Sequence, residues 1–586
     1  MAISCRAVTV RFRPALTLWP CLIALLGTVA CRRSPDRTGE EIRNIVSAEK
    51  APAYLEGVRW KLVRQIYEDR QYSPLWVGPR PVPERTKQLI ANLCDAEREG
   101  LRSTDYRLGE FRRTLERLRP SLDKQRPEAF AVLDLELTTR FLEYGADLLA
   151  GRLDPKAVAS EWYIRERRSS IDSTLRIAVQ APEFHDMVAS LRPRQPGYAQ
   201  LVKVLANYRE IHRQGGWPEV PGRNRLQRGA RGARVAVLRR RLWITGDLEG
   251  SPKDEPVYDR AVVNAVTRFQ ERHGIPSDGI VGAVTLAALN VPVEVRIRQI
   301  QLNLERHRWL PTEFRGRYIY VNIPDYELSA FDRGKLVLKM RVVVGDEYEN
   351  ATPVFADSMT FVVFRPYWHV PQRILVEELI PRIRKRRSYL VRHDFEVLDA
   401  KRDSLVLNPR RIKWSRVDPT NIRMRQKPGS PTNPLGLVKF MFPNQFAVYL
   451  HDTPTRQLFT RPERTLSHGC VWVEKPVELA EYVLEGQGDW DEKKIREAME
   501  TTRSAGEEGS VEGDTVALER PVPVYIVYLT AFVRDGELNF RRDPYGKARE
   551  ALARLGKLSP SDPRLCEELQ KLLVGAGPVG QTPLSQ

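Results

Sequence analysis

The sequence predicts a multidomain α+β protein: a helical domain, a small three-helix module, and a mostly-β domain with a cap insertion. Through the N-terminal half, apolar residues recur at spacings of three and four, the period of amphipathic helices. From Tyr318 onward the period changes to two, which is typical of half-buried strands. With 586 residues, 42% of them hydrophobic, the chain is long enough for several domains with their own cores.

The N-terminus has the pattern of an export signal over residues 1–30. Three arginines precede an apolar stretch, Leu16 to Ala30, that is short for a membrane span. The stretch ends in Val29-Ala30-Cys31, which resembles the lipobox of bacterial lipoproteins, so Cys31 is the expected lipidation site. Thr28 is atypical there, which leaves cleavage by an ordinary signal peptidase open, and an uncleaved signal anchor is a further alternative. Residues 31–50 are polar and are expected to form a tether.

Two helical units follow. Residues 51–225 carry an apolar stripe at helical spacing in Leu133, Leu137, Phe141, Tyr144 and Leu148. Residues 229–291 show three short helix faces separated by turn signals such as Ser277-Asp278-Gly279. A linker helix then runs to Trp309.

The mostly-β domain is expected over residues 316–550. Ile319, Val321 and Ile323 alternate with polar neighbours, and Asp332-Arg333-Gly334 is a turn signal. Residues 375–424 are expected to be helical at first and then irregular, and residues 556–586 to form one short helix and a disordered tail. The remaining expected elements are strands at 336–344, 359–364, 437–442, 446–450 and 522–533 and a helix at 492–501.

Charge and cysteine content limit the classes of function. A net charge of +19 suits an anionic partner such as a wall polymer, a membrane surface or nucleic acid. No nucleic-acid motif occurs, and the basic residues are spread along the chain, which favours a generic basic surface. Of the six cysteines, Cys94, Cys470 and Cys566 lie beyond the leader, so at least one is unpaired, whereas Cys94 and Cys566 could pair or stay reduced. No metal-ligand spacing occurs, so no metal or cofactor is expected.

A histidine and a cysteine near residue 460 form the strongest candidate site. His451 lies in Tyr449-Leu450-His451-Asp452-Thr453, and Cys470 lies in Ser467-His468-Gly469-Cys470. An imidazole is the usual base for a thiol that attacks carbonyls. Glycine before the cysteine allows a tight bend, which could aim amide N–H groups at an oxyanion. A buried, inert cysteine is the alternative for such a pair taken alone.

The flanks of this pair resemble the L,D-transpeptidases, the YkuD-type cell-wall enzymes, and most closely their large YcbB-like branch. The resemblance rests on Pro-Gly…Asn-x-Leu-Gly…Lys-Phe…Pro-Asn…His-Asp-Thr over residues 425–453, followed by Ser-His-Gly-Cys. Residues 365–374 match the Pro-x-Trp-x-Val-Pro segment of this branch, and residues 229–291 resemble its three-helix peptidoglycan-binding module. The resemblance implies a helical scaffold domain over 51–225, a YkuD-type catalytic domain, and a mobile cap near 375–424.

The resemblance also implies a reaction. Cys470 would attack the bond between the third stem residue of peptidoglycan and D-alanine, and an amine of a second stem would resolve the thioester into a 3→3 cross-link. The implied protein is a periplasmic, membrane-anchored lipoprotein of a Gram-negative-type bacterium, and a carbapenem target. Its partners would be peptidoglycan stem peptides and other cell-wall synthesis proteins, without nucleic acid.

The resemblance assigns roles to individual residues. His451 is favoured as the base over His468, which is expected to shape the turn. Asp452 follows the base, but adjacent strand side chains point apart, so a backbone carbonyl is at least as good a candidate to orient the imidazole. The resemblance further implies a role in the oxyanion hole or in shaping the turn for Tyr449, Ser467, His468 and Gly469. It implies substrate binding for Trp368, Asn433, Asp452 and Trp472. Trp472 departs from the family, which generally has arginine or asparagine there.

Two alternatives remain open from the sequence. If water resolves the thioester, the protein is an L,D-carboxypeptidase or a cross-link hydrolase, and no residue decides this. A non-catalytic lipoprotein that tethers the membrane to the wall is a different class, and the intact His451–Cys470 pair argues against it.

Overall fold

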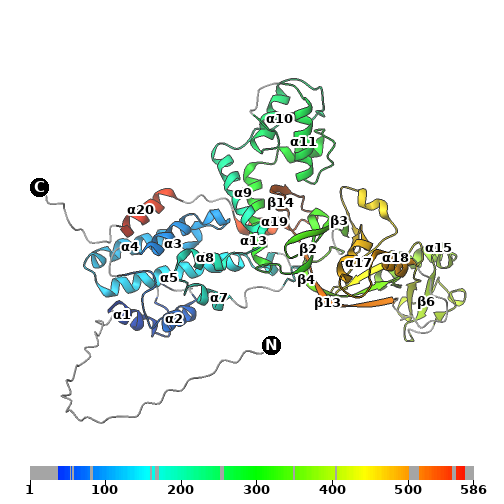
Figure 1. The fold of residues 1–586 in the computed structure, drawn as a ribbon, viewed down its shortest axis with the longest axis horizontal. Coiled ribbons are helices and arrows are strands. Elements are labelled where there is room, and N and C mark those ends of the chain that lie inside the picture. Colours follow the sequence, from blue (N-terminus) through cyan, green and yellow to red (C-terminus); the bar gives the residue numbers. More distant parts are fainter. Residues whose placement is uncertain are drawn as a thin grey trace, which may run out of the picture.

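The computed structural model has helices at one end, a β-rich body towards the other, and a small helical module that projects from the middle (Figure 1). No helix in the described ranges is long and apolar enough to cross a bilayer. The predicted signal and Cys31 lie outside the described residues. The structure describes residues 37–52, 55, 59–78, 83–158, 161–164, 171–250, 256–346, 350–402, 406–500, 514–556 and 562–574.

The helical domain is built around one long helix, α5 (Pro127–Ala150). The predicted stripe is buried, with Leu137, Phe141 and Leu148 fully covered. Asp134 on the same helix accepts hydrogen bonds of 2.7–3.1 Å from the backbone N–H groups of residues 75–77, which satisfies its buried carboxylate. The other elements here are α1 (Arg37–Val46), α2 (Trp60–Asp69), α3 (Glu84–Cys94), η2 (Ala96–Glu99), η3 (Ser103–Tyr106), α4 (Leu108–Asp123), α6 (Pro155–Val158), α7 (Ile171–Ala178) and α8 (Phe184–Leu191).

Both ends of the described chain pack on this domain. The prediction of a tether over residues 31–50 is wrong for α1, because Ile42 and Val46 are buried in the helical core. At the other end, α20 (Pro563–Val574) returns from the β-rich body to lie against α3 and α4 (Figure 1). A disulfide joins Cys94 to Cys566, with a Cα–Cα distance of 5.9 Å. This answers the pairing question that the sequence left open.

The small module contains the three predicted helices. They are α10 (Ala233–Ile244), α11 (Arg260–Arg272) and α12 (Ala283–Leu289), which surround Leu238, Val266 and Phe269. Asp259 caps α11 by accepting a 2.9 Å hydrogen bond from Val262 N–H. Two longer helices, α9 (Pro196–Arg213) and α13 (Val293–Trp309), lie against each other at the base of the module.

A nine-stranded sheet forms the β-rich body. Its order is β11-β3-β12-β10-β9-β4-β13-β1-β2, and a further pairing of β2 with β3 closes the sheet on itself. Helices α17 (Pro476–Leu484) and α18 (Glu492–Glu500) add side chains to its core. The strands are β1 (Arg317–Asn322), β2 (Glu327–Asp332), β3 (Lys335–Gly345), β4 (Phe355–Phe364), β9 (Val438–Met441), β10 (Leu450–His451), β11 (Thr465–Ser467), β12 (Val471–Val473) and β13 (Asp514–Val527).

Two predicted strands are wrong in extent. The strand expected at 446–450 is mostly a loop, because the Asn444 side chain bonds the backbone of Phe442, Phe446 and Val448 in place of a ladder. The strand expected at 522–533 is split between β13 and a separate hairpin of β14 (Ala531–Arg534) and β15 (Glu537–Phe540).

The cap is a subdomain with a core of its own. The prediction that it is irregular after its first helix is wrong, because a four-stranded sheet of order β5-β8-β6-β7 encloses Leu375, Ile383 and Trp414 with its helices. The cap elements are β5 (Trp368–His369), α14 (Gln372–Ile374), η6 (Leu375–Leu379), α15 (Ile380–Lys385), α16 (Tyr389–Arg392), β6 (Phe395–Asp399), β7 (Val406–Leu407), η7 (Pro409–Arg411), η8 (Pro419–Asn421) and β8 (Ile422–Gln426).

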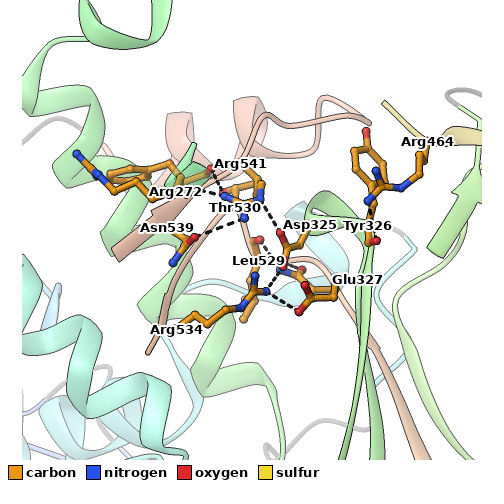
Figure 2. A network of polar contacts seen from close by, with 12 residues as sticks. Arg272, Asp325, Tyr326, Glu327, Arg464, Leu529, Thr530, Arg534, Asn539 and Arg541 are labelled. Carbon is orange, nitrogen blue, oxygen red and sulfur yellow. Dashed lines mark hydrogen bonds and ion pairs between the residues drawn. The ribbon is translucent and has the colours of Figure 1, made fainter. Parts of the chain in front are cut away.

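A buried polar network joins the small module to the sheet (Figure 2). Arg534 and Arg541 both form ion pairs with Asp325, the Arg541 Nε distance being 2.6 Å. Arg541 also donates a 3.0 Å hydrogen bond to the carbonyl of Arg272, the last residue of α11. Burial alone would raise the pKa of Asp325, but the two guanidinium groups outweigh it and hold that pKa below its usual value. The network therefore fixes the module against the β-rich body through a paired buried charge.

Candidate active site

Strands β10 and β12 place the candidate catalytic side chains on one face. The strands run parallel, with Leu450 beside Val471 and His451 beside Trp472. Because side chains alternate along a strand, Tyr449, His451, Cys470 and Trp472 share the face opposite to the core. The ring centroid of His451 lies 5.6 Å from that of Tyr449 and 6.1 Å from that of Trp472, which agrees with this shared face.

Cys470 is partly exposed, and its thiol contacts polar groups. Its Sγ is 3.8 Å from the carbonyl oxygen of Ala447, and the Tyr449 hydroxyl is a hydrogen-bond partner of the thiol. Burial raises the pKa of Cys470 to about 11, although the Tyr449 contacts and the Lys439 charge act in the opposite direction. The resting group is therefore a thiol, which needs a base at the moment of attack.

The turn before Cys470 needs glycine. Gly469 has φ +110°, in the region that residues with a Cβ avoid. Ser467 closes the turn, because its Oγ donates to the Cys470 carbonyl at 2.5 Å and accepts from Gly469 N–H at 3.2 Å. Thr352 donates from Oγ1 to the Gly469 carbonyl at 2.8 Å. The Cys470 N–H, at the end of this turn, is the candidate backbone donor for an oxyanion.

The His451 imidazole is held by a backbone carbonyl. Nδ1 lies 2.6 Å from the carbonyl oxygen of Asp452, so a proton on Nδ1 leaves Nε2 with the lone pair. Burial lowers the pKa of His451 to about 4, and the Lys439 charge adds to this effect. The carbonyls of Asp452 and Pro434 act in the opposite direction, because they stabilise the protonated ring. The ring is thus neutral near pH 7 and able to accept a proton.

The side chains of Asp452 and Asn433 belong to the framework. The Asp452 carboxylate accepts a 2.9 Å hydrogen bond from Leu437 N–H and pairs with Arg456. Asn433 is fully buried and bonds the carbonyl of Pro366 at 2.9 Å. Through these contacts both side chains hold the loops around the site. The substrate-binding role predicted for these two residues stays a prediction.

One residue on the catalytic face was missed by the site prediction. Lys439 on β9 lies directly across the antiparallel ladder from His451, and its Nζ is 5.9 Å from the centroid of the Tyr449 ring. Its charge lowers the pKa values of both His451 and Cys470. The Lys-Phe pair of the motif was the available signal, but only the β9–β10 register shows that the lysine lies beside the base.

The remaining predicted residues lie towards the cap. His468 is exposed, and its Nε2 lies 3.0 Å from the Glu378 carboxylate on η6, so it connects the turn to the cap. Trp368 lies in β5 and packs against Phe395 of the cap, with 6.1 Å between ring centroids. Across the part of the chain that the structure describes, no cluster of His, Cys, Asp and Glu could hold a metal ion.

Family models match three parts of the chain. Residues 316–508 match the YkuD model, "L,D-transpeptidase catalytic domain"; residues 61–205 match a "Scaffold domain"; and residues 231–289 match a "Putative peptidoglycan binding domain". The β-rich body is therefore an L,D-transpeptidase catalytic domain of the YkuD type. The chain combines this domain with a scaffold domain and a peptidoglycan-binding domain, as the resemblance predicted.

One relative that is similar in sequence agrees with the family model of the β-rich body. A "Putative L,D-transpeptidase" of Haemophilus influenzae is 34% identical over 254 residues, which are 43% of this chain and 48% of the relative, so the match spans about half the length of that protein. An L,D-transpeptidase from Stackebrandtia nassauensis aligns with 54% of this chain and 99% of its own, at 17% identity and a TM-score of 0.21. One from Xylanimonas cellulosilytica aligns with 52% and 99%, at 15% identity and a TM-score of 0.14. These two scores are too low to support a structural argument.

Proposed function

We propose that the chain forms 3→3 cross-links between peptidoglycan stem peptides by cysteine acyl transfer. The observation that carries the proposal is the face of β10 and β12 that presents a thiol, a neutral imidazole and a phenol together. These groups correspond to a nucleophile, a general base and a hydrogen-bond donor for an oxyanion. The peptidoglycan-binding domain supports the choice of substrate.

The first half-reaction acylates the enzyme. Cys470 Sγ attacks the carbonyl of the bond between the third stem residue and D-alanine, while His451 accepts the thiol proton. The Cys470 N–H and the Tyr449 hydroxyl stabilise the oxyanion. The carbon–nitrogen bond then breaks, the imidazolium gives its proton to the leaving amine, and D-alanine departs. A thioester between the stem and Cys470 remains.

The second half-reaction forms the cross-link. The side-chain amine of a diamino acid on another stem attacks the thioester carbonyl, and His451 removes a proton from that amine. The thiolate leaves as the new amide forms, and the imidazolium returns the proton to sulfur. Each turnover thus exchanges one amide bond for another and consumes no cofactor.

The electrostatics favour a neutral resting pair over a preformed ion pair. A thiol with a pKa of about 11 beside an imidazole with a pKa of about 4 stays uncharged near pH 7. The proton therefore moves as the sulfur attacks, and the charges exist only along the reaction path. The Asp452 and Pro434 carbonyls support the transient imidazolium, and Lys439 supports the transient negative charge.

We further propose that the protein is exported and held at the membrane by a lipid on Cys31. The support is the basic, apolar, then Val-Ala-Cys order of residues 6–31. Acyl chains contribute about 0.8 kcal/mol per buried CH₂, so a multiply acylated cysteine anchors a protein firmly. Intact-mass analysis of the mature protein is expected to show acylated Cys31 as the first residue. A mature form that begins elsewhere and carries no lipid would contradict the anchor.

The central test is incubation of the purified protein with disaccharide-tetrapeptides, followed by mass spectrometry of the products. We expect 3→3 dimers and free D-alanine from the native chain, and neither from Cys470→Ala. Dimers formed by Cys470→Ala would exclude the acyl-enzyme. Disaccharide-tripeptides without dimers would show that water resolves the thioester and that the enzyme is an L,D-carboxypeptidase.

A further inference from the structure

The helical domain inserts a short extended segment, residues 161–164, into the catalytic domain. Tyr163 N–H donates to the Val354 carbonyl at 2.7 Å, and Val354 N–H donates to the Glu161 carbonyl at 3.1 Å. Trp162 and Ile164 are 2% and 3% exposed and belong to the catalytic core, where Trp162 packs against Trp309 with 5.0 Å between ring centroids. These two buried side chains anchor the segment.

Tyr163 lies between the two anchors and points the other way. Tyr163 is 41% exposed, in contrast to its two neighbours Trp162 and Ile164. The ring packs against Phe446, with 4.4 Å between centroids and 48° between planes. Phe446 in turn packs against Phe355 at 5.1 Å. The two domains thus form an aromatic platform, which we define as Tyr163 and Phe446.

This platform lies beside the candidate nucleophile. Phe446 directly precedes Ala447, whose carbonyl oxygen is 3.8 Å from Cys470 Sγ. The Asn444 side chain holds the Phe446 loop by accepting a 3.0 Å hydrogen bond from Phe446 N–H. On the other side, Val354 lies two residues from Thr352, which bonds the Gly469 carbonyl at 2.8 Å. Two independent connections therefore link Tyr163 to residues that contact Cys470 or the turn before it.

We propose that this platform binds a sugar ring of the donor muropeptide and so selects donors that carry the glycan. The inference rests on the proposed function and names a subsite for its substrate. Aromatic faces carry partial negative charge and attract the positively polarised C–H groups on the flat face of a pyranose. Among the parts of a muropeptide, the sugar rings offer such a broad C–H face, whereas the stem is built of small and charged residues. The exposed Tyr163 ring, held against Phe446, therefore suits the glycan better than the stem.

The test compares a disaccharide-tetrapeptide with the free tetrapeptide as ligands. Calorimetry on the full chain carrying Cys470→Ala measures binding without turnover. We expect Tyr163→Ala in this background to weaken binding of the disaccharide-tetrapeptide roughly tenfold and to leave that of the free tetrapeptide unchanged. Tyr163→Phe keeps the ring and is expected to retain the native affinity. Ile177→Ala, which trims a 74% exposed side chain on α7, is the control for a surface change on the same domain.

The two ligands separate the outcomes. Equal loss for both ligands in Tyr163→Ala would mean that the residue only holds the domains together, and no loss for either would mean that the platform binds no sugar; both results overturn the inference. The proposed function is judged separately, by D-alanine release from the chain with Cys470 intact. Preferential binding of the disaccharide ligand that needs the Tyr163 ring would support the subsite even if no D-alanine were released.

Discussion

The two faces of the β10 and β12 strand pair differ in what they contribute. On one face Leu450, Val471 and Val473 are fully buried in the core of the catalytic domain. On the other face are the candidate nucleophile and its base. Because the side-chain period of a strand is two, a slip of one residue would exchange the faces. The buried face therefore sets the register that brings the reactive groups together.

The same two strands contribute to stability through one face and to reactivity through the other. Apolar burial on the core face stabilises the fold by about 25 cal/mol per Å². On the catalytic face, burial instead shifts the pKa values of Cys470 and His451 away from their usual range. Removing a side chain should thus lower stability on the core face and activity on the catalytic face.

The largest expected effect is on the rate, from loss of the base. His451→Ala is expected to lower D-alanine release by about 10²- to 10⁴-fold, which is the usual contribution of general base catalysis. His468→Ala is the matched control, because its exposed ring contacts Glu378 of the cap and should matter much less. Steady-state kinetics on tetrapeptide stems measures both variants. Equal losses in the two variants would reject His451 as the base.

The reverse effect is expected on the core face. Leu450→Ala should lower the free energy of unfolding by about 2–5 kcal/mol, because it leaves a cavity beside fully buried neighbours. Cys470→Ala, on the opposite face of the same strand pair, should leave the melting temperature nearly unchanged. Thermal unfolding followed by circular dichroism compares the two. A larger loss of stability in Cys470→Ala than in Leu450→Ala would contradict the assignment of stability to the core face.

The charge state of the catalytic face has a pH signature. Since the pKa of Cys470 is raised to about 11, its alkylation by iodoacetamide should accelerate about tenfold per pH unit between pH 7 and 10. Because the pKa of His451 is lowered to about 4, the ring is already neutral above pH 5, and no step is expected near pH 6.5. A rate plateau at neutral pH would instead indicate a preformed thiolate–imidazolium pair.

The smallest expected effect concerns Trp472, where the sequence departs from the family. We expect carbapenems to form a stoichiometric adduct on Cys470. Cys470 in Trp472→Arg should be acylated a few-fold faster if the rate is limited by the bulk of the indole or by its single hydrogen-bond donor. The ring centroid of Trp472 is only 6.1 Å from that of His451, so the exchange acts next to the base. Time-resolved mass spectrometry measures both rates. A folded, reduced native protein that stays unmodified would argue against a reactive Cys470.

The local patterns of the sequence were sufficient for much of the fold and for the centre of the site. The 3.6-residue period of residues 133–148 corresponds to α5, and the period of two after Tyr318 corresponds to β1. The motif identified His451 and Cys470, and the period of two placed Tyr449 on the face of His451. Periodicity failed in the 443–449 loop, because the Asn444 side chain takes the backbone hydrogen bonds that a strand partner would otherwise make. It also failed in the cap, because strands as short as β7 leave little periodic signal.

Local sequence patterns were enough for the domain types, for the period of long elements such as α5 and β1, and for the residues of the catalytic motif. The long-range pairs became visible only in the folded chain: Lys439 beside His451, His468 against Glu378, Tyr163 on Phe446, and Cys94 with Cys566. The physical reason is that periodicity reports only which face of an element is buried. Which partner meets that face depends on register and packing across hundreds of residues, and here that packing brings a tyrosine of the helical domain to the edge of the catalytic site.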